Sequence, residues 1–181
     1  MPYAIDWLLQ QSAADTKCLF FWGHTPKQKG IVDKSCFSQW FPAAFEVAGS
    51  TYATAEHWMM AEKARLFGND EVRQRIIAAR HPDEAKKLGR QVTGFDPLVW
   101  DAQKFELVVT GNYQKFNQHP ALQDYLLTTG DRVLVEASPV DAIWGSGLAA
   151  DHPDAQQPAR WPGQNLLGFA LMEVRDQLRR S

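Results

Sequence analysis

The segment from Thr51 to Gly130 is helical in pattern for most of its length, and no other feature constrains the fold as strongly. Glycine and proline divide it into successive helices, because both residues interrupt the regular geometry of a helix. The piece that opens at Asp96-Pro97 is the longest, although Gly111-Asn112 weakens its middle. The remaining breaks fall at Gly68-Asn69, His81-Pro82 and His119-Pro120.

Strand patterns in the sequence are fewer and shorter than the helical ones. Residues 18–22, CLFFW, predict a buried strand, and residues 132–138, RVLVEAS, alternate as a second one. Residues 37–52 form another extended stretch, which turns at Gly49-Ser50. An amphipathic lead-in over residues 1–17 and a closing helix from Asn165 complete the chain. The sequence therefore predicts one domain over residues 1–181, of the α+β class, predominantly helical with a small sheet.

Composition excludes several classes of protein. A net charge of −2 argues against a general nucleic-acid coat, although it allows a local basic pocket for phosphate. The two cysteines, Cys18 and Cys36, and the five histidines show no metal-binding or disulfide spacing. No run is long and apolar enough for a signal segment or a membrane span. We expect a cytoplasmic protein with no metal, cofactor or membrane partner; the sequence does not indicate its oligomeric state.

The helix that follows Thr51 carries two charges on its apolar face. At about 100° per residue, Glu56 and Lys63 share that face with Met59, and their Cα atoms are about 10 Å apart. That separation is too large for a surface ion pair but suits two groups that flank one ligand. Two interpretations stay open. Lys63 extends its ammonium into water while Glu56 serves the helix dipole, or both face a bound group.

A second unusual stretch is LVEASPVDAIWGSG, residues 134–147. Glu136 ends a predicted strand, and Asp141 and Trp144 precede the flexible segment Gly145–Gly147. Two carboxylates beside a tryptophan suggest acid–base chemistry on a stacked ring. The alternative is structural, with Asp141 capping a short turn, Glu136 solvated, and the glycines forming a plain tight turn.

No serine nucleophile elbow is present, and neither cysteine has a partner that would activate it. The remaining possibility is an amine nucleophile assisted by carboxylates. The pKa of a lysine on an apolar stripe falls on burial, and a neutral amine can attack an electrophilic carbon to form a Schiff base. This interpretation makes Lys63 the candidate nucleophile.

Several blocks together resemble the YbiA-like, or NADAR, family. They are EHWMMAEKA, PDEAKKLGR, the stretch from Trp100 through KFNQHPALQDYLLTTGDRVLVEASPVDAIWGSG, and the ending GQNLLGFALMEVR. FSQWFPAAFE resembles the family's opening block. The resemblance extends from about Phe20 to Leu178, and the order of its motifs makes it specific.

The resemblance implies cleavage of an N-glycosidic bond. Family members hydrolyse phosphoribosyl aminopyrimidine intermediates of riboflavin synthesis, and others remove ADP-ribose from guanine. It also implies that Lys63 forms an imine with the sugar C1, that Glu56 lies in the same pocket, and that Asp141, Trp144 and Gly145 form a D-x-x-W-G element. Asn165 matches a family asparagine near the last helix.

With this chemistry, the candidate catalytic residues are Lys63, Glu56, Asp141 and Glu136. The candidate substrate-binding residues are Trp40, Trp144, Gly145, Asn165 and Trp100. The expected partner is a small N-glycoside or an ADP-ribosylated guanine, with nucleic acid entering only as the carrier of the modified base. Lys104, Arg90 and Arg175 are candidate phosphate ligands, although an ordinary surface charge is the favoured interpretation of each.

The chain departs from the family pattern at three places. Gln39-Trp40 replaces an Asn–aromatic pair, Met60 replaces a glutamine, and the loop of residues 150–163 is longer. These departures leave the substrate open. A non-catalytic module that binds ADP-ribose or NAD is the alternative function, and a structural helical domain is a third.

Overall fold

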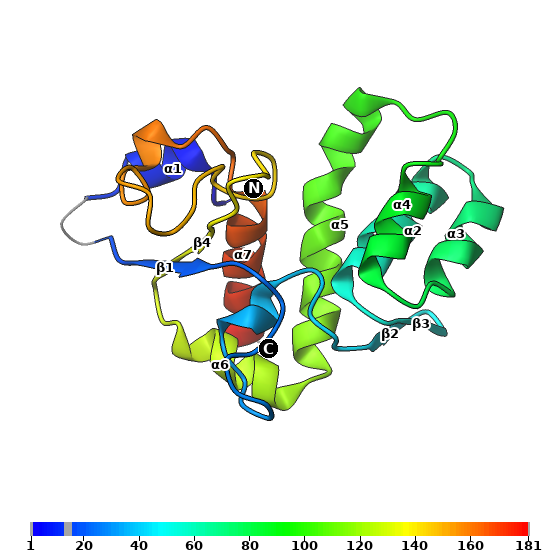
Figure 1. Ribbon diagram of the computed structural model, residues 1–181, viewed down its shortest axis with the longest axis horizontal. Coiled ribbons are helices and arrows are strands. Elements are labelled where there is room, and N and C mark those ends of the chain that lie inside the picture. The colour runs from blue at the N-terminus through cyan, green and yellow to red at the C-terminus, as the bar shows by residue number, and fades with distance from the viewer. Residues whose placement is uncertain (1, 13–15, 181) are drawn as a thin grey trace. The chain divides into compact units, whose positions relative to one another are not determined.

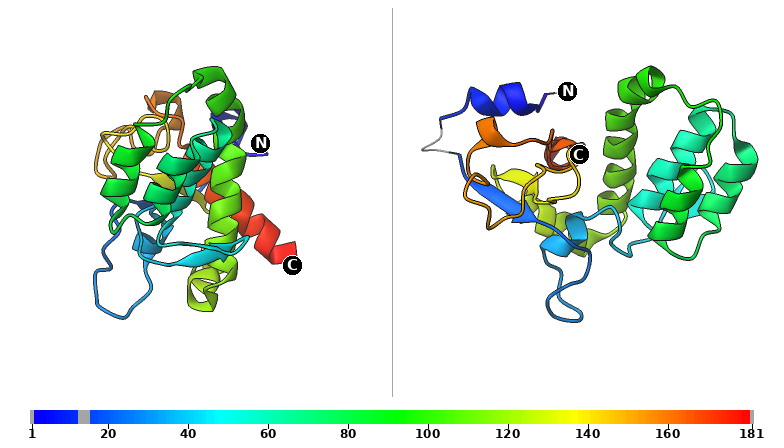
Figure 2. Two further views of the ribbon diagram at one scale, coloured as in Figure 1. Left: turned by 90° about the vertical axis from the view of Figure 1, so that its right-hand side faces the viewer. Right: turned by 45° about the horizontal axis from the view of Figure 1, so that its top comes forward.

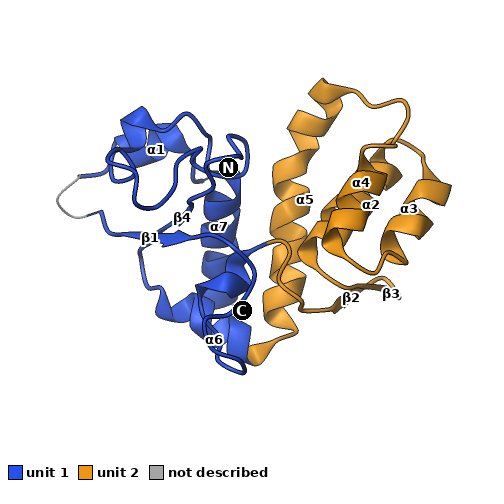
Figure 3. Cartoon of the chain, in the orientation of Figure 1, with its two compact units in different colours: residues 1–38, 121–181 blue, residues 39–120 orange. Residues whose placement is uncertain are grey.

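The computed structural model describes residues 2–12 and 16–180. The chain divides into two compact units, one formed by residues Met1–Ser38 and Ala121–Ser181 and the other by Gln39–Pro120 (Figure 3). Helices predominate, and the strands form two sheets of two strands each among the described residues. The predicted class, α+β with dominant helices and little sheet, is confirmed. That the two units make one domain stays a prediction.

Unit 1 is built on a parallel strand pair. β1 (Cys18–Phe21) lies beside β4 (Val133–Glu136), in a register that pairs Phe21 with Glu136. β4 is buried along Val133–Val135, and α7 (Leu166–Arg180) packs along it (Figure 1). The shorter elements of this unit are α1 (Ile5–Leu9), η1 (Lys34–Phe37), α6 (Pro120–Thr128) and η2 (Pro158–Arg160).

α7 can approach β4 closely because residue 168 is glycine. A Cβ added to Gly168 would lie 2.0 Å from the carbonyl oxygen of Leu134 and 2.6 Å from the side-chain amide atoms of Asn165. No side chain fits in that space. The packing of the last helix on the sheet therefore depends on this single glycine.

Unit 2 consists of a hairpin and four helices. β2 (Phe45–Val47) and β3 (Ser50–Tyr52) pair antiparallel. The two residues between them, Ala48 and Gly49, have φ of 49° and 77°, as a two-residue hairpin turn requires. The helices are α2 (Ala55–Leu66), α3 (Asp70–Ile77), α4 (Pro82–Gly89) and α5 (Pro97–Asn117).

The predicted helix breaks are confirmed by the capping residues. Thr54 accepts a hydrogen bond from the backbone N–H of His57 at the start of α2, and Asp96 accepts one from Leu98 at the start of α5. Pro82 and Pro97 stand in the first turns of α4 and α5.

The single apolar face predicted for α2 is wrong. α2 contacts α3, α4 and α5, which lie around it in both views of Figure 2. His57, Ala61 and Ala64, on the side away from the predicted face, are fully buried. The helix is therefore central to unit 2, which also explains why its sequence shows little segregation of apolar and polar residues.

Two further expectations need correction. α5 runs unbroken through Gly111. The residue is glycine because a Cβ there would lie 2.2 Å from the Trp58 ring. β1 ends at Phe21, and Trp22 is 60% exposed rather than part of a buried strand. Within residues 2–12 and 16–180, no helix has the length and apolar character needed to cross a membrane.

Protonation of His57 makes the stability of unit 2 depend on pH. Its Nε2 lies 3.1 Å from the Ala79 carbonyl oxygen, which can only accept, so Nε2 carries the proton and Nδ1 accepts from the Thr54 hydroxyl at 2.8 Å. Burial lowers the pKa of His57 from its ordinary value of 6.5, with a smaller lowering from His81, against raising by the Ala79 carbonyl and Glu84. The folded state thus favours a neutral ring.

We expect the free energy of unfolding to fall as pH drops below 6.5, because the unfolded chain then binds a proton that folded His57 resists. The slope should reach up to about 1.4 kcal/mol per pH unit, measured by urea unfolding between about pH 7.5 and about pH 5.5. His57→Gln should flatten this dependence, whereas His152→Gln, which alters an exposed ring, should keep it. An unchanged slope in His57→Gln would contradict the assignment.

We expect Gly168→Ala to destabilise the protein by about 3 kcal/mol, because the new methyl must displace the Leu134 carbonyl. Urea unfolding measures the change. Gln177→Ala on the same helix is the control and should shift stability by less than about 0.5 kcal/mol. A stability loss no larger than that of the control would show that α7 can move away from β4 at little cost.

Candidate functional site

Lys63 lies near the end of α2 in a half-buried position. Its Nζ donates a hydrogen bond to the carbonyl oxygen of Gly89 at 3.0 Å. The same nitrogen is 4.4 Å from the centroid of the Phe95 ring and 6.0 Å from that of Trp100. The amine is therefore held against a carbonyl and two aromatic rings, and it does not extend freely into water as the snorkelling interpretation requires.

This environment lowers the pKa of Lys63 from its ordinary value of 10.5. Burial is the larger cause, because it disfavours the charged ammonium, and the nearby positive charge of Arg90 adds to it. A lowered pKa increases the fraction of neutral amine at a given pH. Neutral amine is the form that attacks carbon.

Glu56 lies on the same helix, seven residues before Lys63, and is only 3% exposed. Its backbone N–H donates to the carbonyl oxygen of Gln39 at 2.9 Å. A second carboxylate on α2 was not predicted: Glu62 is 6% exposed and forms an ion pair of 2.7 Å with Arg65. Two buried carboxylates on one helix are costly to desolvate, which is more typical of a functional site than of a core.

Trp40 and Trp100 belong to the same unit as Lys63. Trp40 is half-buried, and the Nζ of Lys86 lies 5.9 Å from its ring. Trp100 is half-buried and faces Lys63. The structure thus places Trp100 directly at the amine, and Trp40 beside a different lysine.

The other predicted residues belong to unit 1, where Glu136 ends β4. Asp141 accepts hydrogen bonds on Oδ1 from the backbone N–H groups of Ile143 and Trp144, at 2.9 and 2.8 Å. Oδ1 of Asp141 therefore caps the turn, as the structural interpretation expects. Gly145 is held against this turn, because a Cβ there would lie 2.9 Å from the carbonyl oxygens of both Asp141 and Glu136.

Backbone hydrogen bonds hold the segment Gly145–Gly147, which favours the tight-turn interpretation over the flexible one. The N–H of Ser146 donates to the carbonyl of Glu136 at 2.8 Å, and the carbonyl of Ser146 accepts from Gly163 at 2.9 Å. The Trp144 carbonyl accepts from Leu167 at 3.0 Å. Backbone hydrogen bonds therefore tie the D-x-x-W-G turn to β4 and to the start of α7.

Asn165 is fully buried and has a positive φ of 53°. Its side-chain amide donates to the carbonyl of Leu134 and accepts from the N–H of Glu136, both at 2.9 Å. Each polar atom of the amide thus makes one hydrogen bond to β4, and a substrate-binding role for Asn165 stays a prediction. Asn165 also positions Glu136.

The three candidate phosphate ligands differ in accessibility. Arg175 is 2% exposed and donates to Thr129 and to the carbonyl of Arg132, so its guanidinium is structural. Lys104 is largely buried and forms an ion pair of 2.6 Å with Asp101. Arg90 is exposed and acts electrostatically on Lys63. Of the three, only Arg90 is available to an anion.

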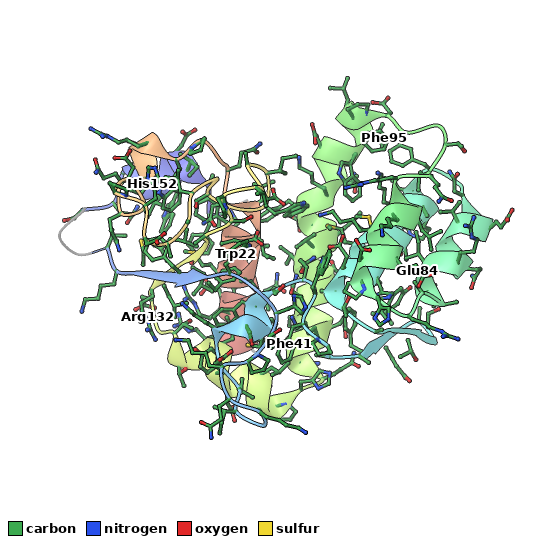
Figure 4. The ribbon with its side chains drawn as sticks, viewed as in Figure 1. Trp22, Phe41, Glu84, Phe95, Arg132 and His152 are labelled. Carbon is green, nitrogen blue, oxygen red and sulfur yellow. The ribbon has the colours of Figure 1, made fainter. Side chains whose placement is uncertain are left out.

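Sequence reasoning missed two exposed aromatic residues, both labelled in Figure 4. Trp22 follows the end of β1, and Phe95 precedes the cap of α5. A signal for Phe95 exists in the sequence, because an apolar residue before a helix cap often packs against the fourth helical residue, here Trp100. Among the described residues, no cluster of three or more histidine, cysteine, aspartate or glutamate side chains could hold a metal ion.

Comparison with known proteins agrees with the motif order. A family model described as the NADAR domain matches residues 20–179. N-glycosidase R617 of Acanthamoeba polyphaga mimivirus is 43% identical over 166 residues, covering 89% of this chain and 96% of the relative. The chloroplastic riboflavin biosynthesis protein PYRR of Zea mays is 35% identical over 135 residues, covering 71% of this chain and 20% of that protein.

N-glycosidase YbiA of Escherichia coli strain K12 is 32% identical over 146 residues, covering 81% of each protein. The NMR structure of the E. coli protein YbiA has a TM-score of 0.69 to this chain, at 28% identity, covering 91% of this chain and 86% of that one. The sequence motifs, the fold and the extent of the family match lead to one conclusion: this chain belongs to the NADAR family.

Proposed function

We propose that the protein is a hydrolase that cleaves the bond between a ribosyl C1 and a base nitrogen, through an imine on Lys63. The observation that carries the proposal is the half-buried Lys63 amine, whose pKa is lowered and which lies against Phe95 and Trp100. Relatives named N-glycosidases support the reaction class. The substrate we propose is a phosphoribosyl aminopyrimidine or an ADP-ribosylated guanine.

In the first step, the neutral amine of Lys63 forms a bond to C1 while the C1–N bond to the base breaks. The electron pair of that bond goes to the base nitrogen, which takes a proton from a carboxylic acid. The amine then loses a proton, the ring C1–O bond opens, and the ring oxygen is protonated. The product is a protonated imine between Lys63 and the open-chain sugar.

In the second step, water adds to the imine carbon and gives a proton to a carboxylate. The C1–N bond to Lys63 then breaks, which releases the sugar aldehyde and restores the amine. Glu56, buried on the same helix, is the proposed carboxylate partner that also stabilises the positive imine. Glu136 and Asp141 remain further candidates for acid and base roles, and Trp40, Trp100 and Trp144 remain candidates for stacking on the base.

The imine can be trapped chemically. Borohydride added during turnover should reduce it to a stable secondary amine on Lys63, found by peptide mass spectrometry, and base release should stop. Lys63→Ala should give no adduct and lose at least about 10³-fold in kcat. Lys87→Ala, which removes an exposed lysine, is the control and should behave as wild type. Full turnover in Lys63→Ala would exclude the covalent mechanism, and binding without base release would favour the non-catalytic module.

Arg90 should set the reactivity of the amine. Arg90→Gln removes a positive charge that lowers the pKa of Lys63, so the amine should keep its proton to higher pH. We expect trapping with ribose 5-phosphate and borohydride to be slower in this variant near neutral pH, and its pH profile to move to higher pH. Arg80→Gln, another exposed arginine, should leave the profile in place. A shift to lower pH would contradict the assigned electrostatics.

A further inference from the structure

Phe95 touches the proposed nucleophile and also faces solvent. The Nζ of Lys63 is 4.4 Å from its ring centroid, closer than to any other ring for which a contact is described. Phe67 packs against Phe95 with centroids 5.2 Å apart and ring planes at 60°. Even so, 41% of Phe95 is exposed. Part of the ring therefore covers the amine, and part is open to a ligand.

The backbone that carries Phe95 is fixed by the start of α5. Phe95 precedes the cap residue Asp96, whose carboxylate accepts from the N–H of Leu98 at 2.8 Å. Gly94, with φ of +68°, directs the chain into this cap. Trp100 is the fourth residue of the helix, the position that packs against the residue before a cap, and it also faces the Lys63 amine at 6.0 Å. Phe95 thus extends from a capped backbone segment and packs against Phe67.

Exposed apolar side chains follow Phe95 closely in the sequence. Leu98 and Val99, which follow it in the first turn of α5, are 81% and 41% exposed. Apolar side chains this exposed offer no ligand for a phosphate, but they suit the face or edge of a flat heterocycle.

We propose that Phe95 is a substrate-binding residue that packs against the base of the N-glycoside and thereby determines which base is accepted. The inference rests on the proposed function. Aromatic pairs prefer offset or edge-to-face contacts with centroids about 4.5–7 Å apart. The proposed base packs on the side of the ring where the amine lies, 4.4 Å from the centroid, so that its glycosidic nitrogen is next to Nζ. C1 then falls within reach of Nζ.

The test compares Phe95→Ala and Phe95→Tyr with Ile31→Ala, a control that removes an exposed apolar side chain of unit 1. Guanosine 5′-monophosphate is the probe for binding, and base release from an N-glycoside is the probe for turnover. Phe95→Ala should weaken binding about tenfold or more and lower kcat/KM to a similar extent. Phe95→Tyr and Ile31→Ala should stay within about twofold of wild type.

A second readout separates base binding from an effect on the amine. Ribose 5-phosphate carries no base, so its trapping on Lys63 by borohydride should proceed in Phe95→Ala at a rate within about threefold of wild type. Equal loss of trapping and of nucleotide binding would show that Phe95 acts through the amine and would overturn the inference. So would unchanged binding and turnover in Phe95→Ala, or a wild-type protein that does not bind the nucleotide. If wild type releases no base from any N-glycoside, the proposed function itself fails.

Discussion

The structure of unit 2 depends on burying α2 on nearly all sides. Three helices surround it, so residues that a surface helix would expose lie in the interior, including Glu56, His57 and Glu62. Each must be compensated there: His57 by the Thr54 hydroxyl and the Ala79 carbonyl, and Glu62 by Arg65. Burial of this kind is expensive, and a chain that retains it on one helix has a reason beyond stability.

The burial of α2 also determines the environment of the Lys63 amine. The final turns of α2 emerge from the surrounding helices far enough to leave the amine half-buried, with Gly89 of α4 and the start of α5 closing over it. Desolvation and Arg90 lower the pKa of the amine together, while the aromatic rings still allow contact with a ligand. An amine of lowered pKa beside apolar rings is what the proposed imine mechanism requires.

In unit 1, backbone contacts hold the end of β4 in place. The end of β4 is held on one side by β1 and on the other by the D-x-x-W-G turn, and Asn165 fixes the backbone on both sides of Val135. Glycines at positions 145 and 168 are required because neighbouring carbonyl oxygens occupy the space of a side chain. Glu136 thereby lies on a well-held strand end, as its proposed acid–base role requires.

The sequence by itself determined the helix boundaries, since Thr54, Pro82, Asp96 and Pro97 act locally through capping and backbone geometry. It also determined the family and the candidate lysine. Only the tertiary structure decided that α2 is surrounded, that Asn165 binds β4, and that Phe95 covers the amine. Those facts depend on contacts between residues distant in the chain, and no local pattern of polarity encodes which partner a buried side chain will meet.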